Sequence, residues 1–571
     1  MAGDLMLDES ERLPGDKRLP TENSIAEKVL WSLLEAGQDI HSHLFGDFAL
    51  ALWNQSQRRL VLARDHIGAR PLYYSGNGLR LAFASDPRAL LALPWVPCEI
   101  DERVIAQHLG LTPGSAGLAL CRGIECLGPG QRLEWGDCKL EVSPWWQPEE
   151  LPAQPPMRQE ECVEQVRMLF DQAIDACLVP GAKIGAHCSG GLDSTAVALQ
   201  AQHLLTNQGR EFQALYSWSP EVSDTFPAGQ QNDERAGLVE LAQALEVPCR
   251  FTRVENADLT KLLDLDHHVH GLSGMYEELP VIAQARGDGV QVLLSGWGGD
   301  EFLTFNKRGY HVWLLTHGRL LRLIEQAPFS WRRPHRCFPA LKWFGVRALL
   351  PMLPSSLRRR FARRNRQGPA PLWSEHLALT HADLLQLQGP FERALRSPRA
   401  WQLALLDSAH LAERMTCWSL WSAGSGLVHR YPLTDRRIVE FVLGLHPDNL
   451  YPEGRSRQLL VEALARHRFL RRDKADPVNE RKRIHLLARM LDGLNRLRIG
   501  GALDGDCDWL DMERFRQTLG QVATDPQACR ADQGVNLFRA AKVWTLWQRQ
   551  QQGRLIDFCN SLEVAHGYGV D

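Results

Sequence analysis

The alternation of hydrophobic and polar positions divides the chain into two parts. Between residues 44 and 135, short apolar runs alternate with turn residues, a pattern that predicts strands. Beyond residue 160, helical spacing is followed by alternating strand and helix patterns, which are typical of βαβ units. We expect strands at residues 48–53, 59–63, 71–74 and 79–83, and then helix 162–178, a strand from 184, helix 193–205, strand 212–217, helix 234–245, and strands 249–254 and 290–294.

This order predicts the fold class as α/β. A β-rich N-terminal part precedes a parallel sheet that carries helices on both faces. The remainder of the chain reads as mostly helical, with apolar spacing at residues 401–420, 438–445 and 459–464. A proline-rich stretch at 144–156 is interpreted as a linker. The 571 residues are therefore expected to form two domains, at residues 1–145 and 157–571.

Composition narrows the classes of function. The formal net charge of −3 gives no overall attraction to nucleic acid. No apolar run reaches the roughly 18 residues needed to span a bilayer, and the first residues lack the pattern of a secretory signal. We therefore expect a cytoplasmic protein without a transmembrane segment. The thirteen cysteines show neither CxxC pairs nor histidine-flanked metal spacing, so reduced thiols are expected.

A glycine-rich string joins the strand at residue 184 to the helix at 193–205. Ser189, Gly190 and Gly191 lack bulky side chains, so backbone N–H groups can approach phosphate oxygens at the helix N-terminus. Asp193 can hold Mg²⁺ between phosphates, and Ser194 adds a hydroxyl. An ordinary glycine turn is the plainer alternative. The string resembles the PP-loop of ATP pyrophosphatases, which implies release of pyrophosphate from ATP.

A second string, SGWGGDE at residues 295–301, also follows a buried strand, and its glycine-rich turn is likewise followed by acidic residues. Its alternative is a flexible surface turn. Because ligands bind at the carboxyl ends of parallel strands, both strings are expected on one edge of the sheet, with Asp300 facing the same metal as Asp193. The residues expected to bind the nucleotide are His187, Ser189, Gly190, Gly191, Asp193, Ser194, Ser217, Ser295 and Gly296.

Together with GDFALALW (46–53), ARDHIGARPLYY (63–74) and YPLTD (431–435), the two strings resemble the asparagine synthetase B family. The stretch 295–310, with FNKRGY at 305–310, looks most like the lasso peptide cyclases of that family. The resemblance implies a glutaminase-like first domain of the N-terminal-nucleophile (Ntn) type and an ATP-binding synthetase domain. It also implies that Lys474, in the string RRDK, stabilises the acyl-adenylate and the departing pyrophosphate. A solvated lysine is the alternative for Lys474.

The departures from the family are also informative. Family glutaminase domains begin with a nucleophilic cysteine, whereas this chain begins Met1-Ala2 and its first cysteine is Cys98, so glutamine hydrolysis is not expected and the domain is expected to be incomplete. By this resemblance, Trp297 stands at the position where asparagine synthetases carry Glu and β-lactam synthetases carry Tyr. An indole is neither a general acid nor a general base. Val428 stands where the family tends to carry Glu.

The resemblance implies ATP and Mg²⁺ as cofactors and macrolactam formation in a ribosomal peptide. An Asp or Glu side chain would be adenylated and attacked by the peptide's N-terminal amine. The expected partners are the precursor core peptide, a leader-peptide-binding protein and a leader peptidase. Three alternatives stay open: an ammonia-dependent asparagine synthetase-like ligase, a β-lactam synthetase-like ligase, and a non-catalytic scaffold.

One segment remains outside this interpretation. Residues 303–366 carry fifteen Lys and Arg against a single acid, Glu325, with Trp313, Trp331 and Trp343 interleaved. A solvated helical face is the commoner meaning of such a run. A docking surface for a peptide, a protein or a membrane is the sharper hypothesis, and Arg358 to Arg360 are its most basic part.

Overall fold

The N-terminal part is built on antiparallel strands, as the sequence pattern predicts. A five-stranded sheet has the order β1-β2-β3-β7-β8, and a three-stranded sheet has the order β5-β4-β6. The predicted strands at 48–53 and 59–63 are confirmed, and β1, which pairs with β2, was not expected. The strand bounds are β1 Ala2–Leu7, β2 Leu44–Asn54, β3 Arg59–Arg64, β4 Tyr73–Gly76, β5 Leu81–Ala84, β6 Glu125–Cys126, β7 Gln131–Gly136 and β8 Lys139–Pro144.

This computed structural model describes only part of the chain, and all statements below concern that part. The described residues are 2–7, 44–110, 117–219, 235–252, 278–327, 337–354, 357–358, 371–386, 396–408, 410–467, 494, 503–524 and 531–553. Lys474 and residues 359–366 lie outside them.

The second part contains the predicted parallel sheet, in the order β11-β10-β9-β12-β13. The predicted strands at 184, 212–217, 249–254 and 290–294 are confirmed, with ends that shift by a few residues. The strand bounds are β9 Ile184–His187, β10 Phe212–Ser217, β11 Cys249–Phe251, β12 Val292–Ser295 and β13 Val428–Arg430. The interpretation of the C-terminal remainder as mostly helical missed β13, which pairs in parallel with β12.

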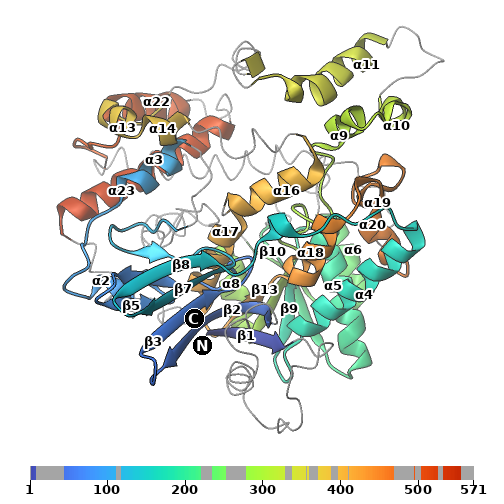
Figure 1. Cartoon of the computed structure of the whole chain (residues 1–571), viewed down its shortest axis with the longest axis horizontal. Helices are drawn as coiled ribbons and strands as arrows, with labels where there is room; N and C mark the ends of the chain where they lie inside the picture. The colour runs from blue at the N-terminus through green and yellow to red at the C-terminus, as the bar shows by residue number, and fades with distance from the viewer. Residues whose placement is uncertain are drawn as a thin grey trace.

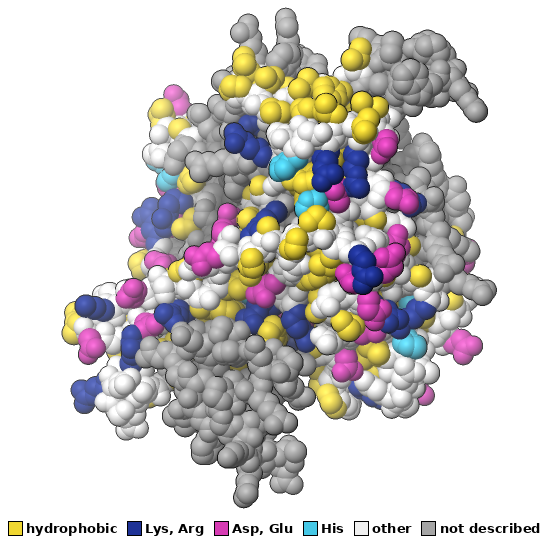
Figure 2. Space-filling view, turned by 45° about the vertical axis from the view of Figure 1, so that its right-hand side comes forward, with side chains coloured by type: hydrophobic (Ala, Val, Ile, Leu, Met, Phe, Trp, Pro, Cys, Tyr) yellow, Lys and Arg dark blue, Asp and Glu magenta, His cyan; other side chains and the backbone are white. Residues whose placement is uncertain are grey.

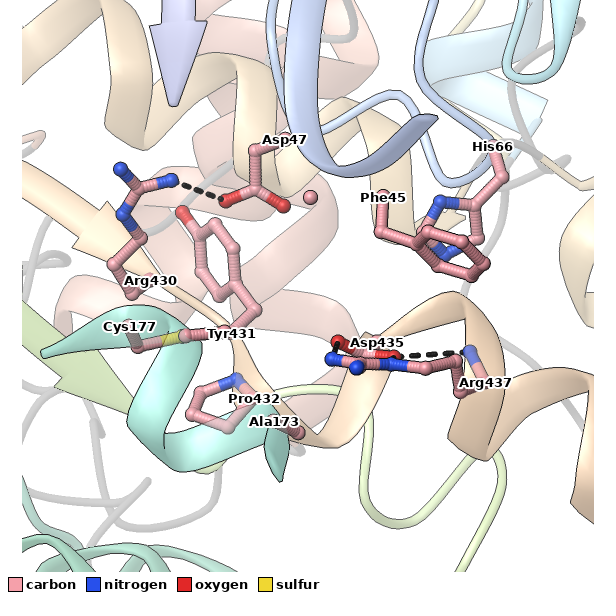
Figure 3. Close-up of a pocket in the computed structure, with 12 residues that line it drawn as sticks. Phe45, Asp47, His66, Ala173, Cys177, Arg430, Tyr431, Pro432, Asp435 and Arg437 are labelled. Atoms are coloured by element: carbon pink, nitrogen blue, oxygen red, sulfur yellow. Dashed lines mark hydrogen bonds and ion pairs between the residues drawn. The ribbon is translucent and has the colours of Figure 1, made fainter. Parts of the chain in front are cut away.

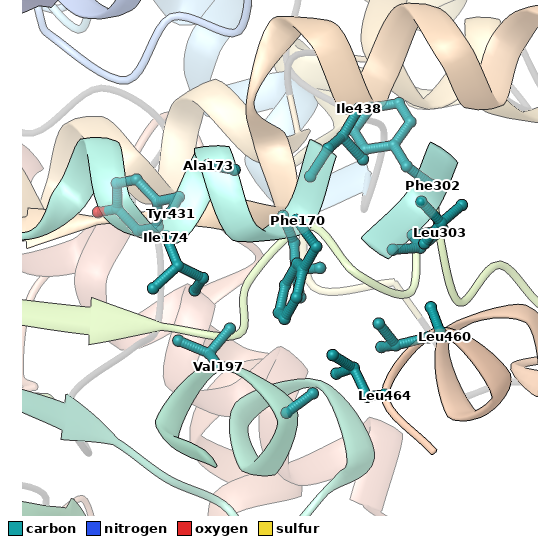
Figure 4. Packing of buried hydrophobic residues seen from close by; sticks show 14 of the residues in the cluster. Phe170, Ala173, Ile174, Val197, Phe302, Leu303, Tyr431, Ile438, Leu460 and Leu464 are labelled. Atoms are coloured by element: carbon teal, nitrogen blue, oxygen red, sulfur yellow. The ribbon is translucent and has the colours of Figure 1, made fainter. Parts of the chain in front are cut away.

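Helices cover both faces of this sheet (Figure 1), which confirms the expected layers. One face packs under α4, α5, α6, α18 and α20, where Phe170 of α4 is fully buried among Ile174, Val197 and Leu460 (Figure 4). The other face packs under α8, with Tyr216 as its largest buried side chain. The helix bounds are α4 Gln159–Cys177, α5 Leu192–Asn207, α6 Arg235–Leu245, α8 Glu278–Gly287, α16 Pro398–Asp407, α17 His410–Ala423, α18 Arg436–Gly444 and α20 Gln458–Ala463.

The last helices of the chain pack on the first part instead of on the parallel sheet. Helices α22 (Met512–Thr524) and α23 (Ala531–Gln551) share one buried core with α3 (Glu102–Gly110). The Trp509 indole donates a hydrogen bond to Glu102 over 3.2 Å, and Arg539 donates to the carbonyl of His108 over 2.7 Å. Figure 1 shows α3 beside α22 and α23, far from β9.

The stretch interpreted as a linker is held to the rest of the protein by several hydrogen bonds. The indole of Trp145 donates to the carbonyl of Arg64 in the first part, whereas that of Trp146 donates to the Glu440 carboxylate on α18. Further along, the Gln154 amide donates to the carbonyl of Gly444 over 2.7 Å. Residues 144–156 therefore tie the two parts of the chain together.

Candidate active site

The two glycine-rich strings lie side by side at one edge of the parallel sheet. Strands β9 and β12 are direct neighbours, and their register pairs His187 with Ser295, the last residue of each strand. Both strands therefore end at the same level, and the loops that follow them leave the sheet together. The expected placement of the two strings on one edge is confirmed.

The first loop, Ser189 to Gly191, leads from β9 into the start of α5 and is held by its own serines: the Gly191 amide donates to the Ser189 hydroxyl over 3.3 Å. Gly190 has φ +77°, a conformation that favours glycine. Gly191 is the N-cap of α5, and no side chain accepts a hydrogen bond from the first turn. The Ser189 amide donates to the Ser194 hydroxyl over 3.2 Å, which fixes the loop on the helix. A helix N-terminus without a side-chain cap can offer its N–H groups to an anion.

The second loop packs closely on the first, and an added Cβ atom would clash with it at two positions. A Cβ atom on Gly296 would lie 2.4 Å from the Ser194 nitrogen. A Cβ atom on Gly299 would lie 2.5 Å from the carboxyl carbon of Asp193. The glycines of the second string therefore bring its backbone against the helix that carries Asp193, and the two loops form one unit.

Asp193 and Asp300 form an acidic pair at this junction. The Asp193 Oδ1 is buried and has no hydrogen-bond partner among the described residues. Burial, and next the Asp300 carboxylate, raise the pKa of Asp193 to about 7. Asp300 is more exposed and pairs with Arg457 over 2.9 Å. Two close carboxylates with an orphaned oxygen fit a hard cation such as Mg²⁺.

The pair alone does not make a complete cation site. Among the described residues, no group of three or more His, Cys, Asp or Glu side chains could hold a metal ion. Mg²⁺ usually keeps one or two protein carboxylates and takes its other ligands from phosphate and water. Asp193 and Asp300 therefore suit a metal that arrives with a nucleotide.

The other residues expected to bind nucleotide have partners inside the protein. His187 lies 3.4 Å from the Glu278 carboxylate, and burial lowers the pKa of His187 to about 4, so its ring is neutral near pH 7. The Ser217 hydroxyl is fully buried and accepts from the Ser219 amide. The Ser295 hydroxyl accepts from the Trp297 amide over 3.2 Å. All lie at the predicted edge, and their contact with nucleotide stays a prediction.

Beyond the second loop, an aromatic wall with a cation on it was missed in the sequence. Its members are Trp297, Trp418 and Arg414, and its Arg414 guanidinium lies 4.0 Å from the centre of the Trp297 ring. Trp418 meets the same ring edge-on at 5.8 Å. The Trp297 N–H is buried without a hydrogen-bond partner in the described structure. Spacing along α17 could have paired Arg414 with Trp418, but nothing in the sequence brings α17 to Trp297.

The same helix brings a histidine to the acidic end of the second loop. The His410 Nε2 lies 3.3 Å from the Glu301 carboxylate, and its ring centre lies 5.2 Å from that of Trp297. His410 is 42% exposed at its side chain, whereas Glu301 is 11% exposed. An accessible imidazole held by a shielded carboxylate can accept a proton.

Val428, the residue in place of the family's Glu, pairs with Val292 on the sheet, three residues before the edge that carries the loops. Lys474, the predicted catalytic residue, lies outside the described residues, so its role stays a prediction.

The strings GDFALALW and ARDHIGARPLYY meet the parallel sheet at a buried junction. Asp47 of β2 pairs with Arg430 of β13 over 3.4 Å, and burial raises the pKa of Asp47 to about 7. His66 lies 2.8 Å from the carbonyl of Thr434. A cavity of about 30 Å³ beside Asp47 and Tyr431 is no larger than a water site (Figure 3). These contacts join the two parts: His66 meets Thr434 of the YPLTD segment, and Asp47 meets Arg430, the residue before it.

Known proteins resemble this chain along most of its length. A family model described as asparagine synthase matches residues 165–558, and one described as a glutamine amidotransferase domain matches residues 11–146. Asparagine synthetase [glutamine-hydrolyzing] 3 of Bacillus subtilis is 26% identical over 453 residues, which are 77% of this chain and 68% of that protein. Amidase chry2 of Gibberella zeae is 27% identical over 293 residues, which are 49% of this chain and 42% of that protein.

A second asparagine synthetase of Bacillus subtilis is 24% identical, across 75% of this chain and 54% of the relative. This chain thus spans between about two fifths and two thirds of these relatives. Among solved structures, the NH3-dependent NAD synthetase of Campylobacter jejuni is 12% identical, covering 36% of this chain and 93% of the other, with a TM-score of 0.19. That TM-score is too low to support a shared fold.

Proposed function

This chain belongs to the asparagine synthase family, and from that premise we propose that it forms a macrolactam in a ribosomal peptide with the use of ATP. In this proposal an Asp or Glu side chain of the peptide is adenylated, and the peptide's own N-terminal amine then displaces AMP. The family membership supports an amide-forming ligase. The observation that carries the finer proposal is the wall of Trp297, Trp418 and Arg414 beside the acidic pair.

The first step uses the two interlocked loops. A carboxylate oxygen of the substrate attacks the α-phosphorus of ATP, and the bond from that phosphorus to the bridging oxygen breaks, so pyrophosphate leaves. The first turn of α5, which has no side-chain cap, would direct its N–H groups to the phosphate oxygens. Asp193 and Asp300 would hold Mg²⁺, which when bound neutralises the charge of the phosphates. Lys474 is the proposed further cation at this step.

The second step would take place beside the wall of Trp297, Trp418 and Arg414. The amine nitrogen attacks the acyl carbon, AMP leaves with the electrons of the broken C–O bond, and the nitrogen loses a proton. His410, held by Glu301, is our candidate to accept that proton. The rings of Trp297 and Trp418 keep water from the acyl-adenylate, which would otherwise hydrolyse.

This wall also bears on the alternatives. In asparagine synthesis or β-lactam formation, a small substrate needs a polar group at the middle of the second string, where this chain has Trp297. An ammonia-dependent, asparagine synthetase-like ligase is the second candidate, because the acidic pair and the helix N-terminus would serve that reaction equally. A β-lactam synthetase-like ligase ranks below it, and a non-catalytic scaffold ranks last because the acidic pair is intact.

A peptide substrate implies proteins that prepare it. We propose a leader-peptide-binding protein and a leader peptidase as partners, because the N-terminal amine must be freed before it can attack. A cytoplasmic site of action fits this supply of ATP and ribosomal peptide. No described helix is long and apolar enough to cross a membrane.

The deciding experiment measures AMP and peptide mass in the same reaction. The purified protein is incubated with ATP, Mg²⁺ and the core peptide encoded beside its gene, and in parallel with aspartate and ammonia. AMP together with loss of one water from the peptide supports the proposal. AMP with aspartate alone replaces it with the asparagine synthetase-like candidate. Absence of AMP in both reactions, with the supposed partners added, leaves the scaffold.

A further inference from the structure

Exposed apolar side chains gather on one end of the molecule. Sixteen large hydrophobic side chains are exposed in the described residues, and eight of them fall between residues 320 and 357. On helix α10 (Leu320–Glu325), Leu321 is 78% and Ile324 is 59% exposed, whereas Leu323 is 1% exposed and anchors the helix. The helix therefore turns one apolar side inward and leaves another bare.

The same arrangement recurs on the neighbouring segment. Helix α11 (Cys337–Phe344) is followed by a π-helical turn, Gly345–Leu349, that packs against α9 (Tyr310–Thr316). Leu341 is 67% exposed and Met352 is 50% exposed, while Ala348 is fully buried. Figure 2 shows hydrophobic side chains in a band along the top of the molecule. We call the eight exposed side chains of this segment the apolar cap: Leu320, Leu321, Ile324, Leu341, Val346, Leu349, Met352 and Leu357.

The apolar cap lies in the most basic segment of an acidic protein. Residues 303–366 hold fifteen Lys and Arg and one acid, although the whole chain carries −3. Within the described part, Arg319, Lys342 and Arg347 are exposed beside the cap. In Figure 2, Lys and Arg side chains appear beneath the apolar band. Hydrophobic side chains with cations at their border match a surface that is anionic outside and apolar within.

We propose that the apolar cap docks on a bilayer surface that contains anionic phospholipid. The leucines enter the boundary between headgroups and acyl chains, and the bordering cations meet the lipid phosphates. Nucleic acid would satisfy the cations but leave the leucines in water, whereas a neutral apolar partner would leave the cations without a role. Of the two alternatives for this segment, the exposed leucines of α10, α11 and the turn after it favour a docking surface over a solvated face. This inference does not depend on the identity of the substrate.

Vesicle sedimentation tests the proposal with the full-length protein. Vesicles of phosphatidylcholine alone are compared with vesicles in which about a third of the lipid is phosphatidylglycerol. We expect the protein to sediment with the anionic vesicles, and to partition about tenfold less onto the neutral ones or at high salt. Equal recovery in the supernatant with and without anionic vesicles would overturn the proposal.

Paired variants separate docking from a general loss of structure. The double variant Leu321→Asp, Ile324→Asp is expected to partition about tenfold less onto anionic vesicles, because it places charge in the cap. Leu379→Asp is the matched control, since Leu379 is 76% exposed on a helix outside the cap. An equal loss in the control, or a lipid-free dimer that the double variant dissociates, would contradict membrane docking. Unchanged thermal unfolding of both variants establishes that each is folded.

Discussion

The two sides of the candidate active site are built by different means. On the phosphate side, Gly296 lies directly against the backbone of Ser194, and Gly299 lies against the Asp193 carboxylate. On the other side, formed by the wall of Trp297, Trp418 and Arg414 and here called the acceptor side, long side chains of α17 lie over Trp297. The Arg414 guanidinium lies 4.0 Å from the centre of the Trp297 ring. Main-chain packing tolerates almost no change, whereas a wall of side chains can be altered one residue at a time. The contrast predicts that substitutions on the first side act through the backbone fold, whereas those on the second act through single side chains.

The largest effect is expected on the phosphate side, from Gly299→Ala. The new methyl group would displace the Asp193 carboxylate, and a shift of about 1 Å near the chemistry costs on the order of 100-fold in rate. Exchange of labelled pyrophosphate into ATP, which reports adenylation alone, measures the loss. Gly287→Ala is the control, because no atom lies within 4 Å of its added Cβ. Full exchange activity in Gly299→Ala would mean that the two loops are not one unit.

A smaller and more selective effect is expected from His410→Asn on the acceptor side. Loss of a general base lowers amide formation by about 100-fold, while pyrophosphate exchange stays near that of the native protein. Comparing the two rates in one preparation is the measurement. Glu301→Gln should reproduce the selective loss in weaker form, since it removes only the group that holds the imidazole. A parallel fall of both rates would assign His410 to the phosphate side instead.

Opening the wall should uncouple the two steps. Trp297→Ala removes the ring under Arg414 and admits water to the acyl-adenylate, so AMP forms without an equal amount of amide. We expect the yield of amide per AMP to fall about tenfold. Trp53→Ala provides the control, because Trp53 is half exposed on β2. An unchanged yield would show that the wall does not exclude water.

The smallest predicted effect concerns stability and pH. The pKa of Asp193 is raised to about 7, so the folded protein holds a proton that the unfolded chain releases near pH 4, and stability falls as pH rises between these values. Asp193→Asn removes that fall. In the absence of nucleotide it should unfold about 2 °C or more above the native protein at pH 8, with little difference at pH 4, while losing activity.

Arg414→Met is the counterpart on the acceptor side. The unfolding temperature of this variant should follow pH as the native protein does, because Asp193 is unchanged. Melting curves at several pH values test both variants. A lower stability of Asp193→Asn at pH 8 would contradict the raised pKa of Asp193.

Much of this architecture could be predicted from sequence, for a physical reason. Buried strands such as β9, β10 and β12 are continuous apolar runs, and glycine-rich turns followed by Asp mark the edge at which they end. Both signals are local. The adjacency of Asp193 and Asp300 followed from the rule that parallel strands end together, which the register of His187 and Ser295 satisfies.

The missed features are those that depend on distant segments. Strand β13 is three residues long and contains His429 and Arg430, which are polar but buried. No hydrophobic pattern in the sequence therefore predicts this strand. His410 and Arg414 reach the second loop across more than a hundred residues. Residues 144–156 have the composition of a linker, yet their two tryptophans are held by hydrogen bonds to opposite parts.

The core shared by α3 and α23 is made of residues that are synthesised far apart in time. Val104 and Ile105 are buried in the same cluster as Leu537 and Trp544, which the ribosome adds more than 400 residues later. At roughly 5–20 residues per second, the first part waits roughly 20–90 s for the helices that cover it. The nascent chain therefore carries a bare apolar surface through most of translation, which is the kind of surface that chaperones hold. A stop codon a few dozen residues too early would remove the cover of the part that is made first.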